Sequence, residues 1–214
     1  MADSTYLVPF ASSEVEMIEK KSRFIGNVFL VTSEEEALAR IAEIAQRHQS
    51  ATHGVYAYDI HAQNVTHFSD AGEPKGTAGM PVLDVFRKRK ITNFVCVVTR
   101  YFGGILLGAG GLVRAYSQTA AMALDAAGEA RMAPYTRLEI LVEYPYFEKL
   151  KYLLSDFPVR ESETAYDLDV THTILIPASI RDSVEAAVSE CTAGRAIVTE
   201  GETLFLPERV EKDG

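Results

Sequence analysis

The sequence predicts an α+β protein of two domains, and three observations lead to that prediction. Helical and strand-like hydrophobic periods alternate along all 214 residues, glycine, charge and proline cluster at residues 128–134, and acidic residues concentrate beyond that cluster. Residues 1–132 carry 13 lysines and arginines against 14 acids, whereas residues 133–214 carry 8 against 16. We therefore expect an N-terminal domain over residues 1–132 and a C-terminal domain over residues 133–214, joined by a linker at 128–134.

The first domain mixes strand and helix patterns and is expected to form an α/β sandwich. Ser33 and Glu36 form a capping box, which marks the start of a helix. Phe94–Val98 is a continuous apolar run, typical of a central strand that is buried on both faces. Strands are predicted at residues 14–19, 22–32, 52–62, 64–68 and 93–100, with a turn at Lys20–Lys21, and helices at 33–48, 81–90 and 112–127.

The second domain repeats a different order of elements. A helix must end before Pro158, and Ser179 with Asp182 is expected to cap a second helix. Strands are predicted at residues 136–143, 159–166, 169–176, 196–199 and 203–206. The resulting order βαββαβ is that of a ferredoxin-like sandwich.

Composition indicates a cytoplasmic protein. The two cysteines exclude a disulfide scaffold, and the N-terminus lacks the basic start and apolar stretch of a signal peptide. No apolar run approaches the length of a membrane span, so no membrane partner is expected. The oligomeric state is left open.

Charge is distributed unevenly within this acidic chain. The formal net charge of −9 argues against a protein coated with nucleic acid, yet residues 72–114 carry seven cations against Glu73 and Asp84. That stretch predicts a basic patch able to hold an anion or an acidic partner. Alternatively, the cations of residues 87–90 only complement the C-terminal end of a helix.

Two loops, residues 69–79 and 101–111, are rich in glycine. The second follows a strand and precedes a helix, an arrangement that builds anion sites from backbone N–H groups. However, no Lys-Ser/Thr pair follows its glycines as in a Walker A motif, and Val113 stands where a dinucleotide fingerprint needs glycine. The alternative is that the glycines only permit a tight turn and close packing of helix on sheet.

The sequence gives little support for a catalytic site or a metal site. Asp70 and Glu73 could form a carboxylate pair, but Asp70 and Thr77 could equally hydrogen-bond the backbone of their own loop. His53 and His61 lie eight residues apart on one predicted strand, which spans about 26 Å and is too far for one ion. We therefore predict no catalytic residue, no metal ligand and no cofactor.

We predict a ligand site between the two loops, with Arg100 as its main anchor. Arg100 ends the buried strand, and its planar guanidinium suits a phosphate or a carboxylate. The alternative is that Arg100 pairs with Asp70 or Glu73 and merely joins the loops. The remaining candidate ligand-binding residues are Asp70, Glu73, Lys75, Thr77, Gly103, Gly104, Gly108, Gly110, Gly111 and Arg114.

These loops resemble the signatures of the YigZ/IMPACT family. The matching stretches are SDAGEPKGTAGMP at residues 69–81 and RYFGGILLGAGGLVRAY at residues 100–116, together with residues 21–24 and 51–53. The resemblance implies an N-terminal domain similar to a small-subunit ribosomal protein and to domain IV of elongation factor G. It implies a C-terminal domain similar to the last domain of that factor. In eukaryotic members it implies translational control through protein contacts.

The sequence departs from the family pattern at three positions of the first loop. Ala71 stands where the family usually has Asp or Asn. Lys75 stands where it often has a small residue or proline, and Met80 stands where it often has an arginine. Losing the acid at position 71 weakens a catalytic interpretation. The expected function is therefore a non-catalytic binding factor linked to translation or stress response, through RNA, ribosome or protein contacts at the two loops. The alternative is an enzyme acting on a small phosphorylated substrate at the same loops, with Asp70 or Glu73 as base.

Overall fold

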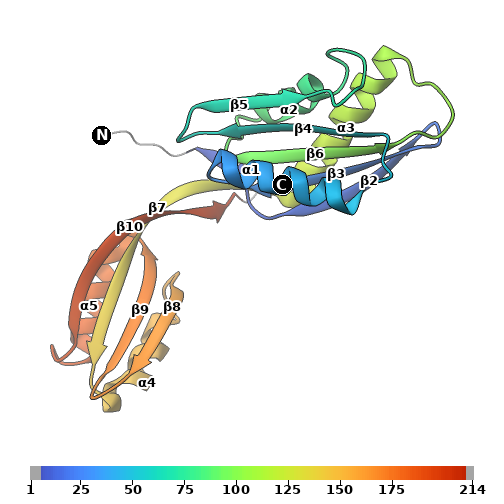
Figure 1. The fold of residues 1–214 in the computed structure, drawn as a ribbon. Helices are drawn as coiled ribbons and strands as arrows, with labels where there is room; N and C mark the ends of the chain where they lie inside the picture. Colours follow the sequence, from blue (N-terminus) through green and yellow to red (C-terminus); the bar gives the residue numbers. More distant parts are fainter. Residues whose placement is uncertain (1–5, 211–214) are drawn as a thin grey trace. The chain divides into compact units, whose positions relative to one another are not determined.

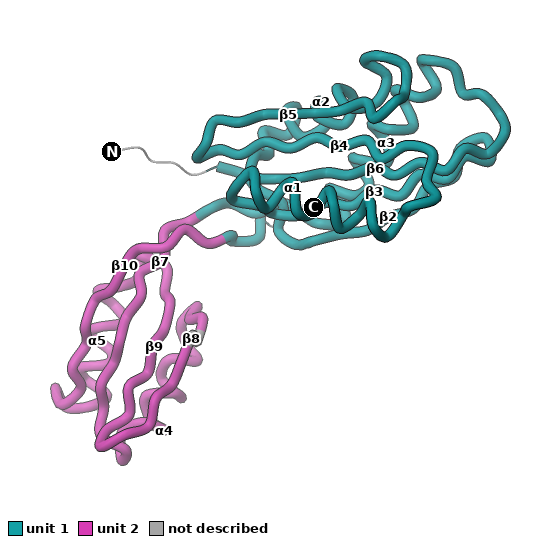
Figure 2. Tube along the Cα trace, in the orientation of Figure 1, with its two compact units in different colours: residues 1–132, 207–214 teal, residues 133–206 magenta. Residues whose placement is uncertain are grey.

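The computed structural model describes residues 6–210, which form two compact units (Figure 2). Unit 1 comprises residues 1–132 and 207–214, and unit 2 comprises residues 133–206. The α+β fold class is confirmed. The end of the chain, which we expected in the second domain, belongs with unit 1 from Pro207 onward.

Unit 1 is built on an antiparallel sheet of order β2-β3-β6-β4-β5 (Figure 1). Its strand β6 lies in the centre and is buried at every residue from Phe94 to Arg100, so the prediction of a central strand is confirmed. The turn at Lys20–Lys21 is also confirmed, and both residues have positive φ. The strands are β2 (Ser13–Glu19), β3 (Ser22–Leu30), β4 (His53–Ile60), β5 (Val65–Ser69) and β6 (Phe94–Tyr101).

Helices cover both faces of this sheet. Helices α2 (Gly79–Lys88) and α3 (Ala109–Ala127) pack on one face, where their apolar side chains meet Phe24, Val28 and Cys96. Helix α1 (Glu34–Arg47) covers the other face. Ser33 caps α1 by accepting a hydrogen bond from the Glu36 N–H, as the capping box predicts.

Unit 2 has the order of elements expected for a ferredoxin-like sandwich. Its sheet has the order β10-β7-β9-β8, and α4 and α5 contribute to its apolar core. The helix N-cap expected at Ser179 is wrong, because a short 3₁₀ turn precedes α5 and Ile180 occupies the cap position. The elements are β7 (Glu129–Val142), α4 (Tyr144–Leu154), β8 (Arg160–Tyr166), β9 (Val170–Pro177), α5 (Arg181–Cys191) and β10 (Ile197–Arg209).

The linker expected at residues 128–134 is wrong. After Gly128, which ends α3 with φ +73°, the chain enters β7 directly. Residues 129–131 pair with β1 (Leu7–Pro9), a strand that the hydrophobic pattern did not reveal. Because these backbone groups are paired, residues 129–131 are poor targets for a protease.

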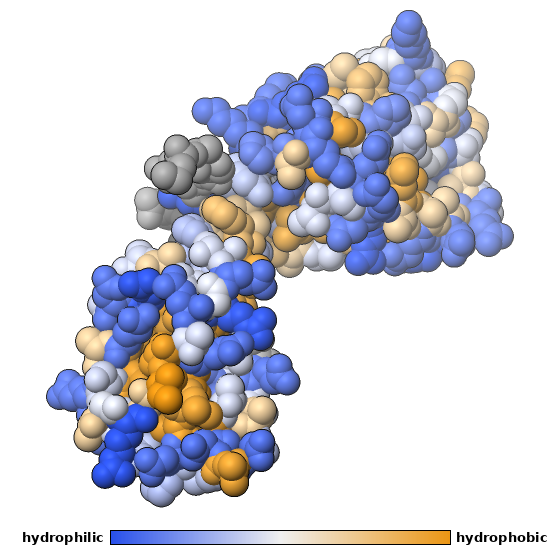
Figure 3. Space-filling view, turned by 60° about the vertical axis from the view of Figure 1, so that its left-hand side comes forward, coloured by the Kyte–Doolittle hydropathy of each residue, from blue (hydrophilic) through white to orange (hydrophobic). Residues whose placement is uncertain are grey.

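Unit 2 has an acidic surface with some apolar exposure. Figure 3 shows apolar residues gathered in the middle of one face of this unit, with hydrophilic residues around them. The large apolar side chains of unit 2 that are exposed are Leu141, Tyr144, Tyr152, Tyr166, Leu168, Ile197 and Phe205. Exposed cations such as Lys149, Lys151 and Arg195 are present on this unit, but acids outnumber cations by 16 to 8 over residues 133–214.

Candidate functional site

Arg100 lies at the end of β6 and is only 5% exposed. The sheet register places it directly between Phe24 of β3 and His53 of β4, so the three side chains share one face. The sheet is antiparallel, so the rule that places ligand sites at the carboxyl ends of parallel strands does not apply to it. The site at this edge depends instead on the two glycine-rich loops that converge there.

A buried ion pair joins the first loop to the sheet. Arg100 Nη1 lies 2.6 Å from Glu73 Oε1, and Glu73 is 8% exposed. The same carboxylate oxygen accepts a hydrogen bond of 2.8 Å from the Tyr116 hydroxyl of α3, and Arg100 Nη2 donates to Ser22 Oγ at 3.3 Å. The pairing offered above as the alternative for Arg100 is thus present in the structure, with Glu73 as the partner.

The surroundings of Tyr116 keep its hydroxyl protonated. Burial raises the pKa of Tyr116 far above its ordinary value, and the hydrogen bond to Glu73 raises it further. Tyr116 therefore remains a hydroxyl donor at every physiological pH. His53 lies at the margin of the ion pair, with its Nε2 3.9 Å from Glu73 Oε2 and its Nδ1 2.9 Å from the Ala71 carbonyl oxygen.

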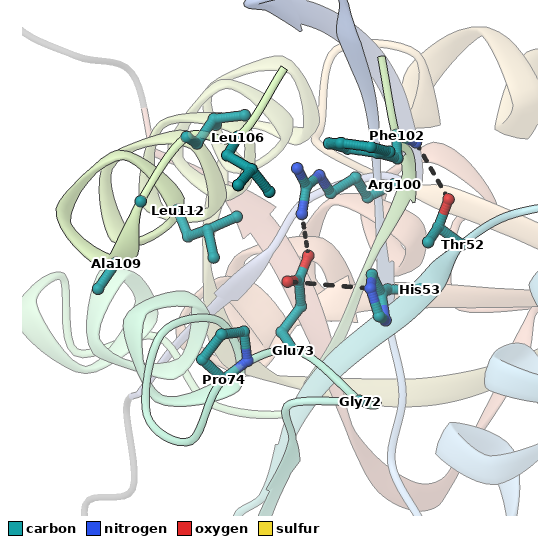
Figure 4. A pocket seen from close by; sticks show the side chains of 12 residues that line it. Thr52, His53, Gly72, Glu73, Pro74, Arg100, Phe102, Leu106, Ala109 and Leu112 are labelled. Carbon is teal, nitrogen blue, oxygen red and sulfur yellow. Dashed lines mark hydrogen bonds and ion pairs between the residues drawn. The ribbon is translucent and has the colours of Figure 1, made fainter. Parts of the chain in front are cut away.

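A pocket of about 430 Å³ opens above the ion pair, between the two glycine-rich loops (Figure 4). We call it the loop pocket. Figure 4 shows Glu73 and Arg100 pointing toward one another, with leucine side chains opposite Phe102 and His53. Its lining comprises Thr52, His53, Gly72, Glu73, Pro74, Arg100, Phe102, Leu106, Leu107, Gly108, Ala109 and Leu112.

The walls of the loop pocket are mainly apolar, and its charged residues, Glu73 and Arg100, pair with each other. Pockets with apolar walls and a few convergent polar groups are typical of ligand sites. The second loop also exposes apolar side chains beside the mouth: Leu106 is 82% exposed, Phe102 45% and Ile105 42%. An apolar group of this kind on an exposed loop indicates a contact surface.

Most polar candidates of the first loop point elsewhere. Asp70 accepts hydrogen bonds from the backbone N–H groups of Gly76, Ala78 and Gly79, and the Thr77 hydroxyl donates to the Pro74 carbonyl oxygen. Burial alone would raise the pKa of Asp70, but these backbone hydrogen bonds together hold it below its usual range. Lys75 is exposed and does not line the pocket.

The glycines of the second loop have distinct roles. A Cβ at Gly103 would lie 2.0 Å from the Lys21 backbone, so this glycine permits the loop to touch the β2–β3 turn. Gly108 has φ +72° and begins α3 at the mouth of the pocket. Gly104 also has a positive φ. A Cβ added at Gly104 or at Gly110 would have no heavy atom of a sequence-distant residue within 4 Å.

Arg114 belongs to a different hollow. Its Nε donates to the Gly110 carbonyl oxygen at 3.3 Å. Together with Glu19, Lys20 and Gly111 it lines a hollow of about 250 Å³ beside the β2–β3 turn. Among the predicted candidates, the loop pocket therefore gathers Glu73, Arg100 and Gly108.

Sequence reasoning missed several residues of the site. His53 was weighed only as a metal ligand, and its position opposite Arg100 depends on strand register. Tyr116 lies within the predicted helix at residues 112–127, and its hydroxyl reaches Glu73 through tertiary packing. The sequence did contain a signal for Phe102 and Leu106, because a group of apolar residues in an exposed glycine-rich loop indicates a contact surface.

Two properties of residues 6–210 bear on the kind of site. No group of three or more histidines, cysteines or acids in this part of the chain could hold a metal ion. No helix found there is long and apolar enough to cross a membrane.

Comparison with known proteins identifies the family. Residues 20–124 match the model of the Impact N-terminal domain, and residues 140–195 match a domain of unknown function, DUF1949. The IMPACT family member YvyE of Bacillus subtilis is 33% identical over 207 residues, which cover 96% of this chain and 95% of that protein. The chain belongs to the IMPACT family. The predicted resemblance is thereby confirmed.

A second relative and a solved structure also match most of this chain. YigZ of Escherichia coli is 32% identical over 89% of this chain and 95% of its own. A crystal structure described as that of a hypothetical protein superimposes with a TM-score of 0.59 at 31% identity, covering 91% of this chain and 96% of the other. Both loop signatures and the loop pocket lie inside the Impact N-terminal domain.

Proposed function

We propose that this IMPACT family protein is a non-catalytic binding factor linked to translation or stress response, and that it holds a protein partner at the loop pocket. The observation that carries the proposal is the pocket itself, whose apolar walls surround a Glu73–Arg100 pair that is already neutral. The link to translation rests on the family resemblance.

A protein partner suits this geometry better than RNA does. Sequence-independent RNA binding needs exposed cations along the phosphate path and aromatic platforms for bases. Arg100 is buried against Glu73 and is therefore not an exposed cation. The aromatic residues of the pocket lining are Phe102 and His53. The leucine-lined walls instead fit aliphatic groups, which protein partners present as anchors.

The enzymatic alternative loses its proposed base. Asp70 is held by three backbone N–H groups, and Glu73 already accepts from Arg100 and Tyr116. The backbone hydrogen bonds that lower the pKa of Asp70 make its carboxylate a weak proton acceptor, and one carboxylate oxygen of Glu73 is already occupied by two donors. A turnover assay with phosphorylated metabolites that showed activity lost in Glu73→Gln would restore this alternative.

Co-sedimentation with ribosomes and associated proteins at rising salt tests the proposal. An apolar protein contact survives added salt and is lost in Leu106→Ser, because that side chain is 82% exposed beside the pocket. Val113→Ser, an exposed apolar residue of α3 outside the lining, is the matched control and should sediment like the wild type. Binding that disappears with salt and ignores Leu106→Ser would replace the protein partner with RNA.

A further inference from the structure

We infer that the occupant of the loop pocket is an acidic protein segment that inserts one aliphatic side chain. This inference rests on the proposed function and names the chemistry of the partner. It is carried by two independent features of unit 1, the neutral apolar interior of the pocket and the positive charge around it.

The interior selects an uncharged aliphatic anchor. Pro74, Leu106, Leu107, Ala109 and Leu112 supply the walls, and the Glu73–Arg100 pair leaves no net charge at the floor. A charged anchor would lose its hydration without finding an unpaired counter-ion there. A volume of about 430 Å³ lies within the range of ligand pockets, so it accommodates an anchor side chain together with adjacent backbone.

Exposed cations lie on the segments that adjoin the pocket, and we call Lys20, Lys21, Lys75 and Arg114 the cationic rim. Lys75 follows Pro74 of the lining, and the backbone of Lys21 lies against Gly103, next to Phe102. Arg114 lies on the first turns of α3, which begins at the pocket. All four side chains are exposed.

The acids of the same region do not cancel this charge. Glu73 is paired with Arg100, whereas Asp70 stays a carboxylate that accepts three backbone hydrogen bonds. Asp70 and Glu19, which lines the hollow beside Arg114, oppose the four cations of the rim with two negative charges.

The start of α3 adds to the positive potential at the mouth. Gly108 occupies the N-cap position and offers no side-chain acceptor, and the first turn contains no acid. The first backbone N–H groups of α3 therefore remain uncapped by side chains, and the helix dipole places partial positive charge there. Acidic residues on either side of the anchor would meet this end of α3 and the cationic rim.

A set of synthetic peptides tests the inference by fluorescence anisotropy with the full chain. The probe is a short peptide of glutamate, serine and glycine around one central leucine. Replacing the leucine with serine should weaken binding about tenfold or more, equivalent to about 1.4 kcal/mol. Replacing the glutamates with glutamine should weaken binding several-fold at low salt, with the difference shrinking as salt is added.

Variants of the protein locate the peptide. Leu106→Ser should reduce binding of the leucine peptide, and Lys75→Glu should reduce binding of the acidic peptide more than of its glutamine version. Lys88→Glu, an equal change of charge at an exposed position in the last turn of α2, is the control and should leave both affinities unchanged.

Four results would overturn the inference, and the last of them would leave the proposed function intact. The first is equal affinity for peptides with and without leucine, or with and without glutamate. The second is displacement of the peptide by oligouridylate, which would assign the site to RNA. The third is self-association abolished by Leu168→Ser, which would make a second copy the occupant, since Leu168 is 92% exposed between two aspartates. A Leu106-dependent partner that survives in co-sedimentation while the peptides fail would reject the acidic segment and retain the proposed function.

Discussion

The two glycine-rich loops of unit 1 use their side chains in opposite ways. In residues 69–79, Asp70 and Thr77 hydrogen-bond their own loop, and Glu73 reaches inward to Arg100. In residues 101–108, Phe102, Ile105 and Leu106 are left exposed. The loop that looks chemically active is internally satisfied, and the loop without polar groups carries the exposed surface. In this site, exposed apolar side chains therefore indicate function better than polar groups whose hydrogen bonds are satisfied within the loop.

The largest effect should follow from breaking the contact of the first loop with the sheet. Glu73→Ala leaves the Arg100 guanidinium buried without its carboxylate, and we expect a loss of about 3–5 kcal/mol in the free energy of unfolding. Urea denaturation measures this loss.

The double variant Glu73→Leu with Arg100→Met tests whether this loss of stability comes from the uncompensated charge. Replacing both charges with apolar groups should recover most of the loss, because no uncompensated charge remains buried. If Glu73→Ala alone unfolds no more easily than the wild type, the ion pair does not hold the loop.

Gly103→Ala should give the next largest effect, by displacing the second loop. Its Cβ would meet the Lys21 carbonyl carbon at 2.0 Å, and backbone must shift to admit it. We expect a cost of about 1–3 kcal/mol by thermal or chemical denaturation. The control is Gly110→Ala, where a Cβ meets open space within α3 and stability should rise by up to about 1 kcal/mol. Equal melting temperatures for the two variants would contradict the close contact.

The difference between these loops also shows what could be predicted from the sequence. Local patterns predicted β6, α1 and α3, because an apolar run, a capping box and a helical period each depend on neighbouring residues. The linker was wrong because β7 depends on partners far along the chain, β1, β9 and β10. Pro134 lies between the part of β7 paired with β1 and the part paired with β9, so it does not interrupt either ladder.

The candidate site was predictable only in part, for the same reason. An ion pair of Arg100 with Asp70 or Glu73 was the alternative to ligand binding by Arg100, and the structure was needed to identify Glu73 as the partner. His53 and Tyr116 join the site through strand register and helix packing, which a single sequence does not contain.

Asp70→Ala should have a moderate effect that depends on pH. Three backbone N–H groups of the first loop lose their acceptor, and we expect a loss of about 1–2 kcal/mol at neutral pH. Since the pKa of Asp70 is lowered in the folded state, its contribution is present above the unfolded value of about 3.9 and is lost as pH falls through the folded value.

Chemical denaturation of wild type and Asp70→Ala between neutral and acidic pH checks this sign. The two stability curves should converge as the pH falls below about 4. Curves that stay parallel throughout would mean that the carboxylate charge adds nothing to the loop.

The smallest effect on stability should come from Leu106→Ser, although the same change should abolish partner binding. Leu106 is 82% exposed, so the folded protein gains almost nothing from its side chain, and we expect a change within about 0.5 kcal/mol. Its neighbour Leu107 is 9% exposed and packs into the core of unit 1, so Leu107→Ala should cost about 2–5 kcal/mol. Melting curves and anisotropy on both variants separate the two roles. A Leu106→Ser protein that melts early would place this side chain among the core residues, and one that binds the leucine peptide normally would remove the second loop from the contact surface.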